Sequence, residues 1–143
     1  MRWADMDAYG HINNVNLLRM LEEARIAAFG VPGGTGKAGN EPMVDLFSAV
    51  PAGTQTLVVE HRVRYAAPLD YRNVPAEVDV WISVVKAASF DLAYEIHDPV
   101  DGGVCVRATT TLAFFSTGES RLMRIPAERR EALEEFLGEP VFR

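Results

Sequence analysis

Cysteine is nearly absent from this chain of 143 residues, because Cys105 is the only one. A lone cysteine forms no intrachain disulfide, and its place in the alternating sequence VCVRATTTLAFF indicates a strand thiol with weak support as a catalytic nucleophile. The chain also lacks clustered cysteine and histidine ligands, the G-x-S-x-G elbow and the H-E-x-x-H helix. We therefore expect a protein that requires neither a metal nor a separate cofactor.

Long apolar runs are missing as well. No stretch approaches the roughly 20 apolar residues of a membrane span, and the N-terminus has no basic region followed by an apolar signal segment. We therefore expect a cytoplasmic protein without a membrane span. Basic residues do not predominate either, since the net charge is −6. A negative net charge argues against a general affinity for the negatively charged phosphates of nucleic acid, although a local basic patch could still hold a nucleotide.

A glycine-rich stretch over residues 31–43 has a superficial likeness to a phosphate-binding loop. Its GGTGK sequence does not fit the loop pattern, because the required first glycine falls at Val31 and Ala38 follows Lys37 where serine or threonine is needed. The nucleotide-triphosphatase interpretation is therefore rejected. The glycines and prolines instead predict a flexible connection, for which we expect a role as a pocket lid.

Length and hydrophobic content, which is 48%, suit one domain over residues 1–143. The clearest element is a helix over residues 14–29, because its apolar residues recur at spacings of three and four. Its arginine and glutamate residues, Arg25 among them, are expected on the polar face. A short amphipathic helix is predicted to begin at Pro126, with packing as its role.

Beyond the first helix, apolar residues alternate with polar ones, which is the period of a strand. The pattern predicts about five strands, in residues 43–50, 57–65, 78–84, 90–96 and 104–115. Five strands after one long helix predict an α+β fold, with a mostly antiparallel, curved sheet wrapped around one long central helix.

Two of the predicted strands have faces that can be assigned. One face of each is expected to carry the alternating apolar residues, which are Leu57, Val59, Val63 and Tyr65 in one strand and Val78, Val80, Ile82 and Val84 in the next. The second face of the latter strand carries Trp81 and Val85, which would be poorly placed in water. We infer that a dimer interface or another cover lies over that face.

The densest group of polar residues is RWADMDAYGHINN, at the entrance of the predicted helix. Its asparagines are expected to cap the helix, while other amides of the first turn stay free. Such a terminus carries roughly half a positive elementary charge and suits a developing oxyanion. With Asp7 nearby, the chain holds the two parts that acyl transfer needs, a base or nucleophile and an oxyanion stabiliser. Ordinary turn and capping residues are the alternative interpretation.

The whole pattern D-x-D-x-x-G-H-x-N-N, followed by LEEAR, resembles the hotdog-fold thioesterases related to 4-hydroxybenzoyl-CoA thioesterase. This motif matches without gaps, and a looser likeness runs through VEHRVRYAAPL, VDVWISVVKAASFDLAYEI, VCVRATTTLAFF and IPAERREALEEFL. The chain departs from the family pattern because only Met1 precedes Arg2 and because Leu17 stands where an aromatic residue is common. We therefore expect a short or truncated first strand and an altered acyl pocket.

The resemblance implies a role for each residue of the motif. Asp7 corresponds to the carboxylate that acts in hydrolysis, and Asp5 is then structural. The backbone N–H of Asn14 corresponds to the amide that polarises the carbonyl. Gly10 lets the chain turn closely over the thioester. His11 is expected to support the site by binding the pocket wall or orienting Asp7.

Further substrate contacts are expected around this motif and at one distant turn. Asn13 and Leu17 are assigned to the substrate pocket. The candidates for contact with the CoA phosphates or the pantetheine arm are Lys86 and Ser89, in VVKAASF, with Arg62 and Arg64 as further contributors. Each of these four residues also has an ordinary interpretation as a solvated residue of a strand or its end.

The resemblance implies hydrolysis of an acyl-CoA thioester to the free acid and CoA, so CoA is part of the substrate rather than a cofactor. Whether Asp7 attacks the carbonyl or activates water stays open, as does the acyl group. A homodimer or homotetramer with active sites between subunits is also implied. The main alternative is a noncatalytic hotdog module that binds acyl-CoA as a sensor or scaffold. A dehydratase is less favoured, because His61 and His97 lie in strand patterns without an accompanying motif.

Overall fold

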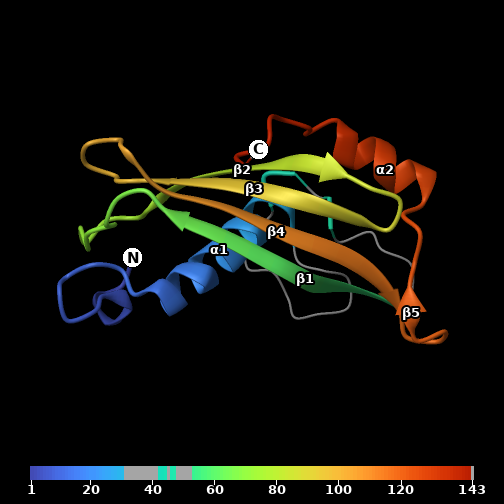
Figure 1. Ribbon diagram of the computed structural model, residues 1–143, viewed down its shortest axis with the longest axis horizontal. Helices are drawn as coiled ribbons and strands as arrows, with labels where there is room; N and C mark the ends of the chain where they lie inside the picture. The colour runs from blue at the N-terminus through green and yellow to red at the C-terminus, as the bar shows by residue number, and fades with distance from the viewer. Residues whose placement is uncertain (31–41, 45, 48–52, 143) are drawn as a thin grey trace.

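The computed structural model describes residues 1–30, 42–44, 46–47 and 53–142 and shows an α+β fold, as predicted (Figure 1). A 3-10 helix and the first α-helix precede all the strands, and the second α-helix follows them. In chain order the elements are η1 (Trp3–Asp5), α1 (Asn14–Phe29), β1 (Thr54–Tyr65), β2 (Glu77–Val85), β3 (Ser89–His97), β4 (Val104–Ser116), β5 (Arg121–Leu122) and α2 (Ala127–Glu134). None of the described helices is long and apolar enough to cross a membrane.

Within the described residues, the strands form one antiparallel sheet in the order β1-β4-β3-β2, and the short β5 pairs with β4. The sheet is curved, and α1 runs along one of its faces (Figure 1). We call this the inner face. The predicted antiparallel, curved sheet with a helix packed against it is thus confirmed, and α1 has 16 residues.

Helix α1 has the predicted bounds, Asn14–Phe29. Its buried residues recur every four positions, as expected for one face of a helix, and they are Leu17, Leu21, Arg25 and Phe29. The placement of Arg25 on the polar face was wrong, because this residue is only 8% exposed and shares the buried stripe. The position in the helical period, and not the charge, decides which face the residue occupies.

The inner face of the sheet completes the core. In β3 the predicted alternation is confirmed, because every second side chain is fully buried, namely Phe90, Leu92, Tyr94 and Ile96. The matching residues of β4, which include Val106, Ala108 and Leu112, pack in the same cluster. The intervening residues of both strands lie on the opposite face, which we call the outer face.

Two β-bulges make part of the predicted face assignment wrong. The register of β1 with β4 shifts between Val58 and Glu60, and that of β2 with β3 shifts between Ile82 and Val84. An inserted residue moves every following side chain to the other face. As a result Leu57 and Val63 lie on opposite faces of β1, and Val84 leaves the face that it was expected to share with Ile82.

The segment predicted as a strand over residues 43–50 is described only at four positions, and these form no strand. The backbone N–H groups of Val44, Leu46 and Phe47 donate to carbonyls at the end of α1, those of Ala28 and Phe29. This part of the segment therefore satisfies free carbonyls of the helix terminus instead of pairing with the sheet. The rest of it, and the predicted lid apart from residues 42–43, lies outside the described residues.

The C-terminal segment packs along the β2 edge of the sheet and then reaches Trp81 on the outer face. Helix α2 begins after Pro126 and packs through Leu133, which is 2% exposed, so its predicted role is confirmed. Beyond it, the amide of Gly138 donates to the carbonyl of Ile82, and the Trp81 indole N–H donates to the carbonyl of Glu139. The chain itself therefore supplies a cover for Trp81, and this residue gives no separate support to a dimer interface.

Candidate active site

The turn before α1 holds the carboxylate of Asp7 in place. Its Oδ1 atom accepts hydrogen bonds from the backbone amides of Tyr9, at 2.8 Å, and His11, at 3.2 Å. The turn is closed by Gly10, which has a φ of 77° and an amide that donates to the carbonyl of Asp7. Within the described residues Oδ2 of Asp7 makes no hydrogen bond. One oxygen thus orients the group and the other is left for chemistry.

The first turn of α1 contributes the second polar group. Asn13 is the N-cap, since its side chain accepts from the amide of Val15 at 2.9 Å and its carbonyl accepts from the amide of Leu17. No hydrogen bond to the amide of Asn14 forms within the described part of the chain. This amide therefore remains a donor at the positive end of the helix dipole.

Asp7 and Asn14 both line one cavity of about 390 Å³. Its polar residues Asp7, His11 and Asn14 come from the N-terminal motif, whereas most of its apolar lining comes from α1, β4, the end of β1 and the chain after it. The lining residues are Asp7, His11, Ile12, Asn14, Leu17, Tyr65, Ala66, Ala67, Pro68, Leu69 and Val106. Four residues assigned to the site from sequence, Asp7, His11, Asn14 and Leu17, therefore meet at the cavity.

Two motif residues do not line the cavity but support those that do. Gly10 is needed for its positive φ rather than for a close approach, because a Cβ atom there would meet nothing within 4 Å. The side-chain oxygen of Asn13 is already used as the helix cap. Both residues thus shape the backbone around the cavity, and their predicted contact with substrate stays a prediction.

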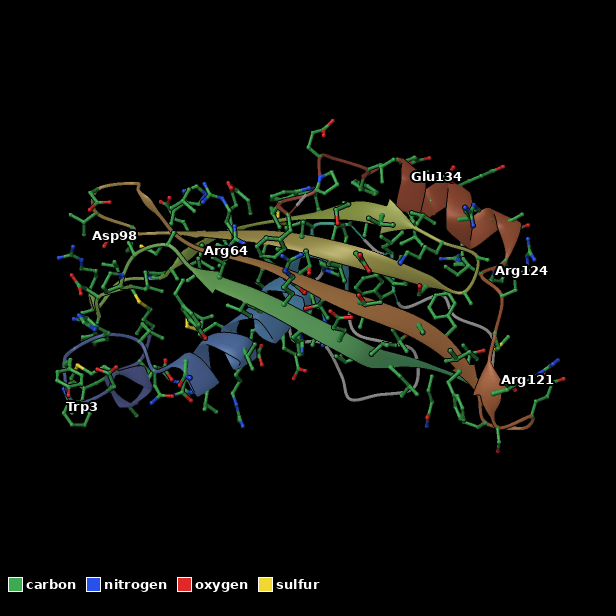
Figure 2. The ribbon with its side chains drawn as sticks, in the orientation of Figure 1. Trp3, Arg64, Asp98, Arg121, Arg124 and Glu134 are labelled. Atoms are coloured by element: carbon green, nitrogen blue, oxygen red, sulfur yellow. The ribbon has the colours of Figure 1, made fainter. Side chains whose placement is uncertain are left out.

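Lys86 and Ser89 lie far from the cavity within one chain. Lys86 follows the end of β2 and Ser89 begins β3, and the amide of Lys86 donates to the carbonyl of Ser89 across the turn between them. Figure 1 shows this turn and the N-terminal motif at opposite ends of the sheet. In Figure 2, Trp3 of the motif lies at one end of the sheet, and Arg124, which lines a recess together with Ala87 of this turn, lies at the other.

Sequence reasoning missed the wall formed by residues 65–69. This wall is fixed to β4, because the amides of Ala66 and Ala67 both donate to the carbonyl of Cys105. It is also fixed to the motif, because the amide of Ile12 donates to the carbonyl of Leu69. The apolar character of YAAPL was the available signal, but the contact joins residues far apart in the sequence.

Asp5 points away from this cavity and has the structural role predicted for it. The residue is 4% exposed, and its carboxylate accepts from the backbone amide of Arg2 at 2.7 Å and from the Arg2 side chain at 2.9 Å. The side-chain hydrogen bond from Arg2 lowers the pKa of Asp5 below its usual value, although burial acts in the opposite direction. A larger recess of about 570 Å³ lies on this side of the motif, but Arg2 and Asp5 in its lining already neutralise each other.

The other titratable residues that could take part in catalysis or bind a metal do not line this cavity. Cys105 is the predicted strand thiol, and burial raises its pKa, which disfavours the nucleophilic thiolate. His61 bonds Thr110 through Nδ1 at 2.9 Å.

A possible metal-binding group lies on the outer face of the sheet. Its residues, Asp79, Glu95 and His97, bring ligand atoms within 4.8 Å of one another, and Glu95 is also paired to Arg107 at 3.0 Å. Ion pairing explains this partly exposed group, because Asp79 also lies 2.9 Å from Nε2 of His97.

A carboxylate and a free helix amide at one end of an apolar cavity are the arrangement that acyl-transfer enzymes use. The chain matches the model of the thioesterase-like superfamily over residues 1–133 and therefore belongs to this superfamily. Membership supports thioester hydrolysis as the general class of reaction. No curated protein matches the chain.

Solved structures with the same fold include several thioesterases of low sequence identity. A predicted thioesterase from Bacillus stearothermophilus has a TM-score of 0.73 and 22% identity, over 98% of this chain and 93% of its own. YbaW, a probable thioesterase from Escherichia coli, has a TM-score of 0.73 and 22% identity, over 96% and 95%. A 1,4-dihydroxy-2-naphthoyl-CoA thioesterase from Synechocystis has a TM-score of 0.70 and 18% identity, over 94% and 91%.

The charge on Asp5 is expected to stabilise the fold in a pH-dependent way. Because its folded-state pKa is lowered, the ionised carboxylate stabilises the protein above the unfolded-state pKa of about 3.9, and this is lost as the pH falls through the folded-state pKa. Asp5→Asn should therefore lower the free energy of unfolding at neutral pH, with a gap from wild type that narrows in acid. Urea unfolding across the pH range measures this gap, and a constant gap would contradict the assignment.

Proposed function

We propose that this protein hydrolyses an acyl-CoA thioester to the free acid and CoA. The observation that carries the proposal is the shared cavity, which is lined by Asp7, by Asn14 and by an apolar wall, while Oδ2 of Asp7 and the amide of Asn14 have no hydrogen-bond partner among the described residues. In this proposal Asp7 attacks the carbonyl or activates water, and the Asn14 amide stabilises the oxyanion that forms.

The leaving group explains why so few residues suffice. A thiol has a pKa of about 8.5, so it departs as a thiolate with less acid assistance than an alkoxide or an amine requires. A carboxylate and an oxyanion donor can then carry the reaction, and neither a metal nor a cofactor is required in this scheme.

The cavity favours an acyl group that is mainly apolar. Its deeper lining includes Ile12, Leu17 and Leu69, which are at most 7% exposed, while its polar groups lie on the motif side. A volume of about 390 Å³ falls in the ordinary range for small-ligand pockets. An acyl chain can therefore occupy the apolar part while its thioester carbon lies near Asp7.

We further propose that two copies of the chain associate through β1. This strand pairs with β4 on one side, and its other edge has no partner among the described residues. It is 12 residues long and exposes Leu57, Val58 and Val59, a combination that favours pairing with another strand. In such a dimer the two sheets would join into one, which would wrap around the α1 helices of both subunits. This is the hotdog arrangement, in which each sheet encloses a central helix.

A dimer also bears on the proposed CoA contacts. Lys86 and Ser89 lie at the other end of the sheet from Asp7 in one chain (Figure 1). Their proposed contact with CoA phosphates or the pantetheine arm therefore requires that a second subunit contributes them. In a homotetramer, too, these residues would have to come from another subunit. The proposal leaves open whether the assembly is a dimer or a tetramer and whether CoA or a carrier protein delivers the acyl group.

Asp7→Asn is expected to reduce thiol release from acyl-CoA substrates by at least about a hundredfold, because the amide is neither a base nor a nucleophile. A panel of short, long and aromatic acyl-CoAs measures this loss. Asp101→Asn is the matched control, because Asp101 also accepts a backbone hydrogen bond in a turn, at 2.7 Å from the amide of Gly103, but lies outside the cavity. Tight acyl-CoA binding by the wild type without turnover would instead favour the noncatalytic sensor or scaffold.

Asn14→Pro is expected to lower kcat by about a hundredfold, because it removes the proposed oxyanion donor. Proline is tolerated at the first position of a helix, and Asn13 before it has the extended backbone, φ −62° and ψ 138°, that a following proline requires. Asn14→Ala keeps the amide and is the comparison. Steady-state kinetics with matched circular dichroism test this, and equal activity of the two variants would contradict the role of the amide.

Val59→Lys is expected to shift the protein toward a monomer, because a charged residue on an edge strand opposes strand pairing. Val59 is 59% exposed at the bulge of β1. Light scattering coupled to size exclusion measures the mass. Val100→Lys, at a turn residue that is 68% exposed, is the control and should keep the wild-type mass. A wild type that is already monomeric would overturn the proposed association.

A further inference from the structure

His11 faces a second carboxylate, and the backbone explains why. Residues His11 and Asp70 form an isolated antiparallel bridge, flanked by hydrogen bonds from Ile12 to Leu69 and from Tyr71 to Gly10. Residues directly opposite in such a pair have side chains on the same side and close together. The Nε2 atom of His11 accordingly lies 3.5 Å from Oδ1 of Asp70.

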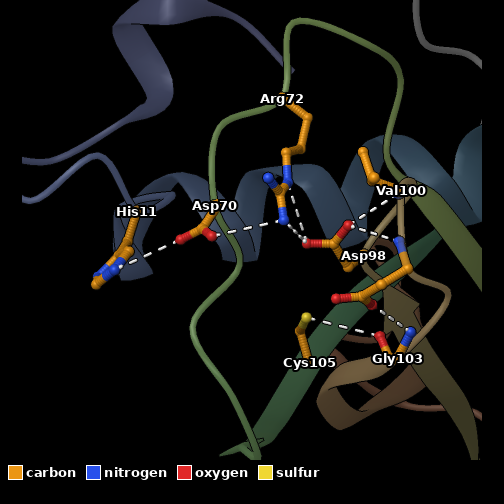
Figure 3. Close-up of polar contacts among 8 residues, drawn as sticks. His11, Asp70, Arg72, Asp98, Val100, Gly103 and Cys105 are labelled. Atoms are coloured by element: carbon orange, nitrogen blue, oxygen red, sulfur yellow. Dashed lines mark hydrogen bonds and ion pairs between the residues drawn. The ribbon is translucent and has the colours of Figure 1, made fainter.

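Asp70 is in turn held by a row of charged groups, shown in Figure 3. Its Oδ2 atom lies 3.7 Å from the Arg72 guanidinium, which also contacts Asp98 at 3.1 Å. Asp98 is 4% exposed and accepts from the backbone amides of Val100 and Asp101, so it fixes the far end of the row. The row connects the motif, the chain after β1 and the turn between β3 and β4.

We propose that Asp70 is a positioning residue for the hydrolysis, acting through His11. His11 lines the cavity beside Asp7, whereas Asp70 does not line it. Asp70 sets the tautomer of the neutral imidazole, with the proton on Nε2 toward its carboxylate and the lone pair on Nδ1. The ring then offers an acceptor of fixed orientation to a donor in the cavity, such as the water that Asp7 activates.

Each residue of the row restrains the next one. Arg72 and Asp98 restrain the carboxylate of Asp70, the carboxylate restrains the ring, and the backbone amide of His11 restrains Asp7 at 3.2 Å. Loss of the Asp70 charge leaves this backbone contact intact while it releases the ring. Loss of the Asp70 charge is therefore expected to lower kcat rather than to change KM. This defect should appear only in a protein that still has the His11 imidazole.

The test rests partly on the proposed function, so it has one readout that needs no substrate. In protein labelled with 15N at its three histidines, Asp70→Asn should shift the His11 ring signals away from the Nε2–H tautomer. Asp70→Glu, which keeps a carboxylate, should largely retain that tautomer. Asp79→Asn is the matched control, because Asp79 contacts Nε2 of His97 at 2.9 Å and should alter the His97 signals alone.

Kinetics supply the second readout. Asp70→Asn should lower kcat about tenfold with little change in KM, at the low end of the effects known for carboxylates that orient metal-ligating histidines. In a His11→Gln background the same substitution should cost nothing further. An unchanged His11 tautomer, or an equal loss in both backgrounds, would overturn the proposal. Failure of the wild type to turn over any acyl-CoA would count against the proposed function, while the tautomer would still decide whether Asp70 sets the ring.

Discussion

The candidate site depends on how the first turn of α1 is capped. Asn13 satisfies the amide of Val15 with its side chain and the amide of Leu17 with its carbonyl, while nothing in the described chain binds the amide of Asn14. The cap stabilises the helix and fixes its direction, and the free amide keeps the partial positive charge of the terminus. One asparagine therefore anchors the helix, while the next residue keeps a free backbone donor and lines the cavity.

The sequence predicts those parts of the site whose residues lie close together along the chain. Asp7, His11, Asn14 and Leu17 follow one another closely, so a turn and the first turns of one helix suffice to bring them to a common cavity. Helical spacing alone places Leu17 near Asn14 on the same side of α1. The bounds of α1 and the alternation in β3 were predictable for the same reason, since each depends on the period of a single element.

The parts that sequence reasoning missed depend on pairings between distant segments. A bulge in β1 reverses the faces after Val58, and no residue in that run of β-branched side chains signals where the extra residue falls. The cover over Trp81 comes from Gly138 and Glu139, which only the folded chain brings to β2. Asp70 is likewise invisible as a site residue until its bridge with His11 is formed.

The position of the cavity ties it to the edge of the sheet. Tyr65 ends β1 and lines the cavity, and the residues that follow are fastened to β4 through the carbonyl of Cys105. A change in the position of β1 would therefore move one wall directly, while Asp7 and Asn14 would stay with the motif and the helix. The apolar wall and the polar end belong to different parts of the fold, so a substitution in the chain after β1 can reshape the wall of the cavity while the Asp7 carboxylate and the Asn14 amide keep their places.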